Sequence, residues 1–182
     1  QILADALTIL EKFGTLDVNL MYIGAKNNVF NSHVEFFSKM KKGTLYGLTP
    51  LVNETACGPD FYEEAKKSGH YIELDPAMSM EEAKEYANKM DVLYTDTWVD
   101  MEFFNNPAYQ KQKEETLAKM MPYQLNGDFT KDSKAIVFHD MPMHVGFEIS
   151  QDVVDKNLDH ILDEAENRRH AEKAVMYTLL NS

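Results

Sequence analysis

Short apolar runs alternate with amphipathic segments along this 182-residue chain, and that alternation narrowly limits the fold it can adopt. The first run, Val18 to Gly24, suits a buried parallel strand, because strands covered on both faces read as continuous apolar stretches. Further strands are expected at 44–48, 71–74, 92–95 and 135–139, and helices at 2–13, 28–41, 59–67 and 80–88. The pattern predicts a single α/β domain spanning 1–182, with a doubly wound, mainly parallel, Rossmann-like sheet and helices on both faces.

The second half of the chain is less regular. Residues 99–121 form the longest interruption, with a helix expected near 109–120; such an excursion is either a mobile lid or a solvated surface insertion. Beyond the last strand we expect a short segment at Ile161–Leu162 and a final helix from about Asn167 to Leu180. The charged segment Asp163 to His170 is expected to open that helix.

Charge and cysteine content exclude several classes of protein. The formal net charge is −12 and no basic stripe interrupts the acidic background, so nucleic acid and anionic membranes are poor partners. No apolar run reaches the roughly 20 residues that span a bilayer. Cys57 is the only cysteine, which excludes an intrachain disulfide and favours a reducing, cytoplasmic compartment. Gln1 lies inside an amphipathic pattern with no initiator Met, which we interpret as the start of an excised domain.

Ligands of a doubly wound sheet bind beyond the carboxyl ends of its strands, and polar residues follow several of those ends. The segment Gly24–Asn28 is predicted to be a turn into a helix whose free N–H groups can hold an anion, although Asn is equally a common helix cap. It lacks the G-x-G-x-x-G spacing, which disfavours a dinucleotide. Asp96 and Asp100 follow the fourth strand and can grip a cationic amine; alternatively Asp96 caps a turn and Asp100 is solvated.

Two more positions can carry chemistry. His139 ends the fifth strand, where it can polarise a carbonyl, shuttle a proton, or simply be a buried structural residue. A metal site built on His139 and His144 is unattractive because no third ligand is indicated nearby. Arg168 suits either an ion pair or a bidentate phosphate contact.

Five segments, taken in order, resemble the aspartate/ornithine carbamoyltransferase family, specifically its ornithine branch and the second-substrate domain. The matches are Gln1 to Thr8 with the end of H-P-x-Q-x-L-A-D-x-L-T, Gly24 to Ser32 with G-D-G-N-N-V-x-N-S, Asp96 to Met101 with D-x-W-x-S-M, His139 to Pro142 with H-C-L-P, and Glu164 to Arg168 with E-A-E-N-R. Five ordered motifs across nearly the whole chain are far more specific than any one of them.

The resemblance implies transfer of a carbamoyl group from carbamoyl phosphate to the amino group of ornithine or a related amine, without metal or organic cofactor. Gln1, His139, Met141 and Arg168 would contact carbamoyl phosphate, and His139, Asp140 and Arg168 would be catalytic. Asn28, Asp96, Asp100 and Met101 would bind the amine. The family also implies a preceding carbamoyl-phosphate domain, absent from this chain, a closing loop after Asp100, and a homotrimer or higher homo-oligomer. The chain alone is expected to be inactive.

Two departures from the family pattern concern the substrate. Asp140 replaces the cysteine of H-C-L-P and Asp100 replaces the serine of D-x-W-x-S-M. Extra negative charge beside the expected substrate site disfavours a substrate with an α-carboxylate, such as ornithine. One interpretation is therefore that the accepted amine lacks this group and is a diamine such as putrescine or agmatine. A competing interpretation keeps ornithine and lets Asp140 accept hydrogen bonds from the amine or Arg168. A third interpretation is a non-catalytic relative that binds a small amine or amino acid. The residues expected on carbamoyl phosphate, Gln1, His139 and Arg168, disfavour it, because a pure amine binder has no need of them.

Overall fold

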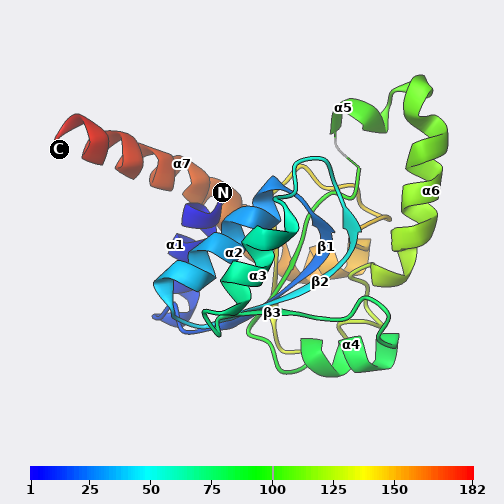
Figure 1. Ribbon diagram of the computed structural model, residues 1–182, viewed down its shortest axis with the longest axis horizontal. Helices are drawn as coiled ribbons and strands as arrows, with labels where there is room; N and C mark the ends of the chain where they lie inside the picture. Colours follow the sequence, from blue (N-terminus) through cyan, green and yellow to red (C-terminus); the bar gives the residue numbers. More distant parts are fainter. Residues whose placement is uncertain (100) are drawn as a thin grey trace.

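The computed structural model describes residues 1–99 and 101–182 and has one sheet with helices on both faces (Figure 1). The elements are α1 (Ile2–Phe13), β1 (Asn19–Lys26), α2 (Asn28–Met40), β2 (Thr44–Val52), α3 (Pro59–Lys66), β3 (Tyr71–Glu73), α4 (Met80–Ala87), β4 (Val92–Thr95), α5 (Met101–Phe104), η1 (Pro107–Tyr109), α6 (Gln110–Met120), η2 (Met121–Tyr123), β5 (Ile136–His139) and α7 (Gln151–Leu180). Among these described residues no helix is both long and apolar enough to cross a bilayer.

All strand pairings in the sheet are parallel, and the strand order is β3-β2-β1-β4-β5. The predicted α/β fold class and its five strands are confirmed. In the β4–β5 register Thr95 pairs with His139. The residues that follow these two strands therefore emerge next to each other at one edge of the sheet.

Alternate residues of β1 enter two separate cores. Leu20 and Tyr22 pack with α1, α2 and α3 on one face of the sheet. Met21 and Ile23 pack with α4 and α7 on the other. This period-two alternation, with both faces apolar, explains why the strand reads as an uninterrupted hydrophobic run.

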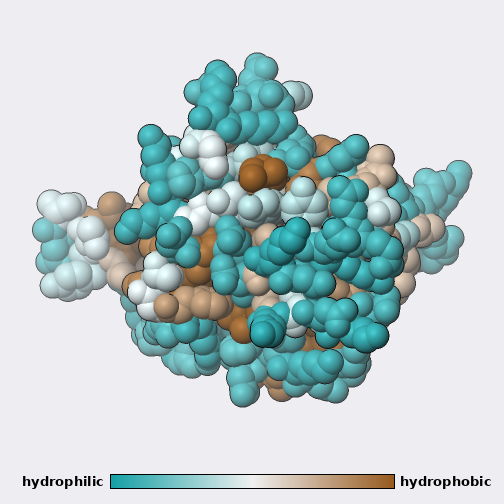
Figure 2. Space-filling view, turned by 90° about the horizontal axis from the view of Figure 1, so that it is seen from below, coloured by the Kyte–Doolittle hydropathy of each residue, from teal (hydrophilic) through white to brown (hydrophobic). Residues whose placement is uncertain are grey.

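The predicted C-terminal helix was wrong at its start. One continuous helix, α7, runs from Gln151, so Ile161–Leu162 is not a separate segment and Asp163 to His170 lies mid-helix. Val154 and Ile161 are buried two turns apart, but the charged residues between them hide that spacing in the sequence. The end of α7 projects from the body, and Figure 2 shows white-to-brown side chains where this arm joins a largely teal surface.

The predicted turn at Gly24 also begins later than expected. β1 continues through Gly24 to Lys26 because its pairing with β2 resumes at Ala25 and Leu51 after an irregularity in the register. The turn is confined to Asn27, which caps α2.

Candidate active site

Asn27 and Asp96 are joined at the carboxyl edge of the sheet. Asn27 has an extended backbone, and its Oδ1 accepts from the N–H of Phe30, so the side chain caps α2. Its Nδ2 donates to Asp96 Oδ2 at 2.6 Å. The remaining Asp96 oxygen, Oδ1, accepts from the Thr97 N–H at 2.6 Å. Protein donors therefore satisfy both oxygens of Asp96, a buried residue.

The other residues expected on the amine side are less well placed. Asn28 is exposed, and its N–H donates to Thr55 Oγ1 at 3.2 Å. No hydrogen bond joins Asn28 to Asp96 among the described residues. Asp100 lies outside those residues, and so does the side chain of Met101, whose backbone begins α5.

Both ring nitrogens of His139 already have partners within the chain. Its Nδ1 accepts from the Met141 N–H at 3.0 Å, so Nε2 carries the proton and donates to Glu148 Oε1 at 3.2 Å. The same Glu148 oxygen accepts from the His144 N–H. His139 is fully buried, and its ring fixes the start and end of the loop between Met141 and Glu148.

Glu164 joins Gln1 to the end of β5. Gln1 Nε2 donates to Asp5 Oδ1 at 2.6 Å and to Glu164 Oε1 at 2.9 Å. The other Glu164 oxygen accepts from the backbone N–H of His139 at 2.9 Å. One buried carboxyl on α7 thus fixes two residues that the sequence assigned to the same substrate. Burial, and then the neighbouring Asp5, raise the pKa of Glu164 well above its usual range.

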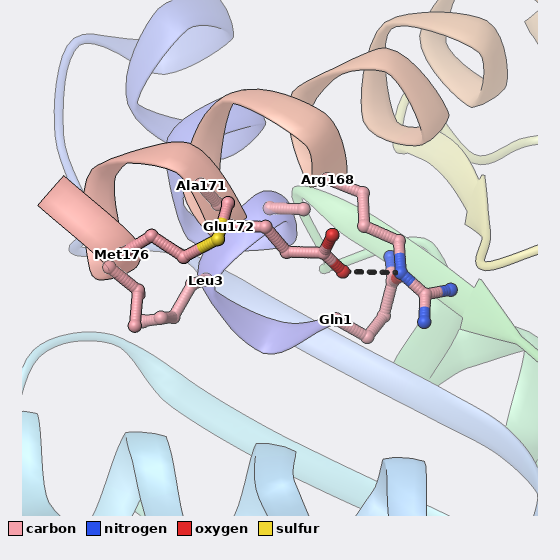
Figure 3. A pocket seen from close by; sticks show the side chains of 8 residues that line it. Gln1, Leu3, Arg168, Ala171, Glu172 and Met176 are labelled. Carbon is pink, nitrogen blue, oxygen red and sulfur yellow. Dashed lines mark hydrogen bonds and ion pairs between the residues drawn. The ribbon is translucent and has the colours of Figure 1, made fainter.

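Gln1 and Arg168 meet in a pocket of about 330 Å³ between α1 and α7. Figure 3 shows both side chains at one end of it, with Leu3 and Met176 at the other. Arg168 is about half exposed, and its Nε lies 3.3 Å from Glu172 one turn along the helix. An exposed pair of this kind holds the guanidinium weakly, leaving its donors available to an anion.

Asp140 lies between the two groups of residues. It follows His139 directly and faces Asp96 across the edge of the sheet. Its Oδ1 is buried, 3.7 Å from His139 Nδ1, and has no hydrogen-bond partner among the described residues. Burial, and then the charge of Asp96, raise the pKa of Asp140 to about 9.

Sequence reasoning missed several residues that build this edge. Asn27, Glu148 and Glu164 hold the predicted residues in place, and Tyr22 lies beneath Asp96 and Asp140. Asn27 and Glu164 stand inside motifs already singled out, so an N-cap reading and helical periodicity offered a signal for them. Glu148 lies nine residues from His139 in a loop, where no periodicity indicates a contact.

The segment after Asp96 borders a second pocket. This pocket, of about 260 Å³, lies between the end of β2 and helix α6. Its lining includes Trp98, Phe103, Lys113 and Asn53. Phe104 also stacks on His144 with ring centroids 3.6 Å apart, which ties α5 to the loop after His139.

A family model described as the Asp/Orn binding domain of aspartate/ornithine carbamoyltransferase matches residues 16–179. The chain belongs to this family. The ornithine carbamoyltransferase of Chlorobaculum tepidum is 35% identical over 187 residues, which cover 100% of this chain and 51% of that protein. The ornithine carbamoyltransferase of Pyrococcus horikoshii is 36% identical, covering 99% and 55%.

Solved structures of the family agree with the fold. Ornithine carbamoyltransferase from Pyrococcus furiosus superposes with a TM-score of 0.76 at 31% identity, covering 95% of this chain and 53% of that one. The anabolic enzyme from Campylobacter jejuni, at 24% identity, gives 0.79 and shows the fold alone. The chain spans about half the length of its carbamoyltransferase relatives.

Proposed function

We propose that this chain is the amine-binding half of a carbamoyltransferase that moves the carbamoyl group of carbamoyl phosphate onto ornithine and releases phosphate. The observation that carries the proposal is Glu164, which fixes Gln1 and His139 together beside the pair Asp96 and Asp140. Residues expected on the two substrates thus converge at one sheet edge. The named relatives are ornithine carbamoyltransferases, which supports the choice of reaction.

Gln1 is oriented as a hydrogen-bond acceptor. Its amide nitrogen is committed to Asp5 and Glu164, whereas its Oε1 has no partner among the described residues. This oxygen suits the amino group of a carbamoyl moiety, and Arg168 in the same pocket suits the phosphate. Catalysis then rests on positioning two substrates and stabilising the oxyanion formed when the amine attacks.

His139 acts in this proposal through the loop that follows it. A direct contact from its ring to the carbamoyl oxygen would first displace Met141 or Glu148. We therefore assign His139 the role of positioning Asp140 and Met141 beside the carbamoyl group. Asn28, Asp100 and Met101 remain predicted contacts of the amine.

The missing half of the enzyme would carry most of the phosphate contacts and dock on α1 and α7. Apolar residues line the pocket and groove between these helices: the exposed Leu3, Val175, Met176 and Leu179, and the partly buried Leu7. Single-domain proteins rarely leave such a contiguous patch open to water. The segment 99–121 would close over the amine. Trimer assembly and a cytoplasmic location remain predictions from the resemblance and from the lone Cys57.

The test is an assay of the full-length protein with carbamoyl phosphate and a panel of ornithine, putrescine, agmatine and lysine. We expect carbamoyl transfer to ornithine, with release of phosphate. A preference for putrescine or agmatine would instead assign the enzyme to a diamine, the outcome that the added charge of Asp140 and Asp100 favours. Calorimetric binding of an amine without binding of carbamoyl phosphate would contradict transferase activity and identify an amine-binding relative.

A further inference from the structure

Asp140 and Asp96 face each other where adjacent strands β4 and β5 end, and they differ in their partners. Asp96 accepts from Asn27 on one oxygen and from Thr97 on the other. Asp140 has one buried oxygen with no partner among the described residues, and its side chain is 14% exposed. Among the described residues, Asp140 is thus the one of the two with a carboxyl oxygen that accepts no hydrogen bond.

None of the described residues around Asp140 donates a hydrogen bond to its Oδ1. His139 Nδ1, at 3.7 Å, already accepts from the Met141 N–H and therefore carries no proton to donate. Asp96 faces Asp140 from the end of β4; as a carboxylate it donates no hydrogen bond, so the two carboxyl groups can share one only through a proton on one of them. A carboxyl oxygen left unpaired in a buried place costs stability, which suggests a ligand as its partner.

The charged surroundings raise the pKa of Asp140 toward that of an amine. The titratable groups that face it come from several elements: Asp96 after β4, Asp5 on α1, Glu164 on α7, His139 on β5, and the hydroxyls of Tyr22 on β1 and Tyr94 on β4. Burial and the nearby Asp96 raise the pKa of Asp140 to about 9, close to the ~10.4 of a free alkylamine. Proton transfer between groups of similar pKa has a small thermodynamic barrier.

We propose that the Asp140 carboxylate is the general base that removes the proton of the attacking amine. This assignment rests on the proposed carbamoyl transfer. As the amine nitrogen bonds to the carbonyl carbon, an N–H proton passes to Asp140. Collapse of the tetrahedral intermediate breaks the carbon–oxygen bond to phosphate, and Asp140 returns the proton to the departing phosphate oxygen.

The decisive variants in the full-length protein are Asp140→Asn, which keeps the shape but cannot accept a proton, and Asp140→Cys, whose thiolate can. With saturating ornithine we expect kcat to fall about 100-fold or more in Asp140→Asn. In Asp140→Cys it should stay within about 10-fold of wild type. The KM for carbamoyl phosphate should stay unchanged in both. The exposed Asp132→Asn is the matched control.

The pH profile separates a base from a structural residue. In the wild type, kcat/KM for the amine should show two ionisations, one near pH 9 from Asp140 and one near ~10.4 from the amine itself. In Asp140→Asn only the ionisation of the amine should remain. If the asparagine variant does not fold, the cysteine variant tests whether position 140 supplies the base. Its pH profile of kcat/KM must then have a midpoint that differs from that of the wild type.

Three outcomes would overturn the proposal. Asp140→Asn with a kcat within threefold of wild type means that no base acts at this position. Equal losses in the asparagine and cysteine variants, with an unmoved midpoint, indicate a structural role. Both results leave carbamoyl transfer standing. Absence of transfer by the wild-type protein to any amine in the panel removes the proposed function, and this assignment with it.

Discussion

Asn27 links the start of α2 to Asp96 by using both ends of one amide: Oδ1 caps the helix and Nδ2 donates to Asp96 at 2.6 Å. Because the two partners need opposite hydrogen-bonding groups, only an amide of this length serves both. The arrangement orients Asp96 while the helix cap holds the amide in place.

Replacing Asn27 separates these two roles. Asn27→Ser keeps an N-cap acceptor but leaves Asp96 Oδ2 without its donor, so we expect a loss of about 1–3 kcal/mol in unfolding free energy. Asn27→Asp keeps the cap but places a second carboxylate against Asp96 and should lose at least as much. Urea denaturation at pH 7 measures both, and a serine variant as stable as wild type would show that water replaces the amide.

Arg168 and Arg169 form a matched pair for the phosphate side. Arg168 lines the pocket with Gln1, whereas Arg169 is paired with Glu166 outside it. Arg168→Ala in the full-length protein should raise the KM for carbamoyl phosphate about 10- to 100-fold, since charge-assisted hydrogen bonds are lost. Arg169→Ala should leave it unchanged. Steady-state kinetics with varied carbamoyl phosphate make the comparison, and equal effects in the two variants would count against the pocket.

Val175 and Tyr177 test the proposed contact with the preceding half. Val175 lines both the pocket and the groove between α1 and α7, while Tyr177 lines neither and is 71% exposed. In the full-length protein Val175→Glu should destabilise by about 2 kcal/mol or more, because a charge replaces a side chain buried in the interface. Tyr177→Glu should be nearly neutral. Thermal denaturation compares the stability of the two variants. If Val175→Glu is as stable as wild type, the surface between α1 and α7 is exposed to water in the full-length protein.

Ile161 and Leu162 are adjacent on α7 but differ in burial, at 0% and 49% exposed. Ile161→Ala removes methyl groups from the core beneath the sheet and should cost about 2–5 kcal/mol. Leu162→Ala should cost less than about 1 kcal/mol, because half of that side chain already meets solvent. Chemical denaturation of each variant checks the continuous helix: similar costs at both positions would contradict its observed orientation.

Glu73 gives the chain a pH-dependent stabilisation. Partial burial raises its pKa, but hydrogen bonds from Lys26 and Lys66 outweigh burial and lower it below the usual value. The stabilisation is therefore fully present above the unfolded-state pKa of ~4.3 and is lost as pH falls through the lower folded-state value. Since the pair is partly exposed, Glu73→Gln should cost under about 1 kcal/mol at pH 7.

The readout for Glu73 is the difference in unfolding free energy between wild type and Glu73→Gln, measured from pH 7 down to pH 3. It should shrink toward the acid end. The control is Glu64→Gln, which removes an exposed ion pair with Lys67 and should cost little unfolding free energy at pH 7. A difference that grows as pH falls would reverse the assigned sign.

The sequence by itself determined the five strands, most of the helices and the order of the motifs, because apolar periodicity and glycine positions are local properties. It placed Asp96 and His139 at strand ends, and parallel pairing then brings such ends together. The sequence did not predict where α7 begins, because charged residues interrupt the apolar pattern between Val154 and Ile161.

Only the tertiary structure decided which polar groups meet. The contacts of Glu148 with His139, and of Glu164 with Gln1, join residues distant in the chain, and no local pattern encodes them. The same holds for Asp140: the sequence showed a carboxylate where the family pattern has cysteine. Burial beside Asp96 decided that this carboxyl has a raised pKa and one buried oxygen without a hydrogen-bond partner among the described residues.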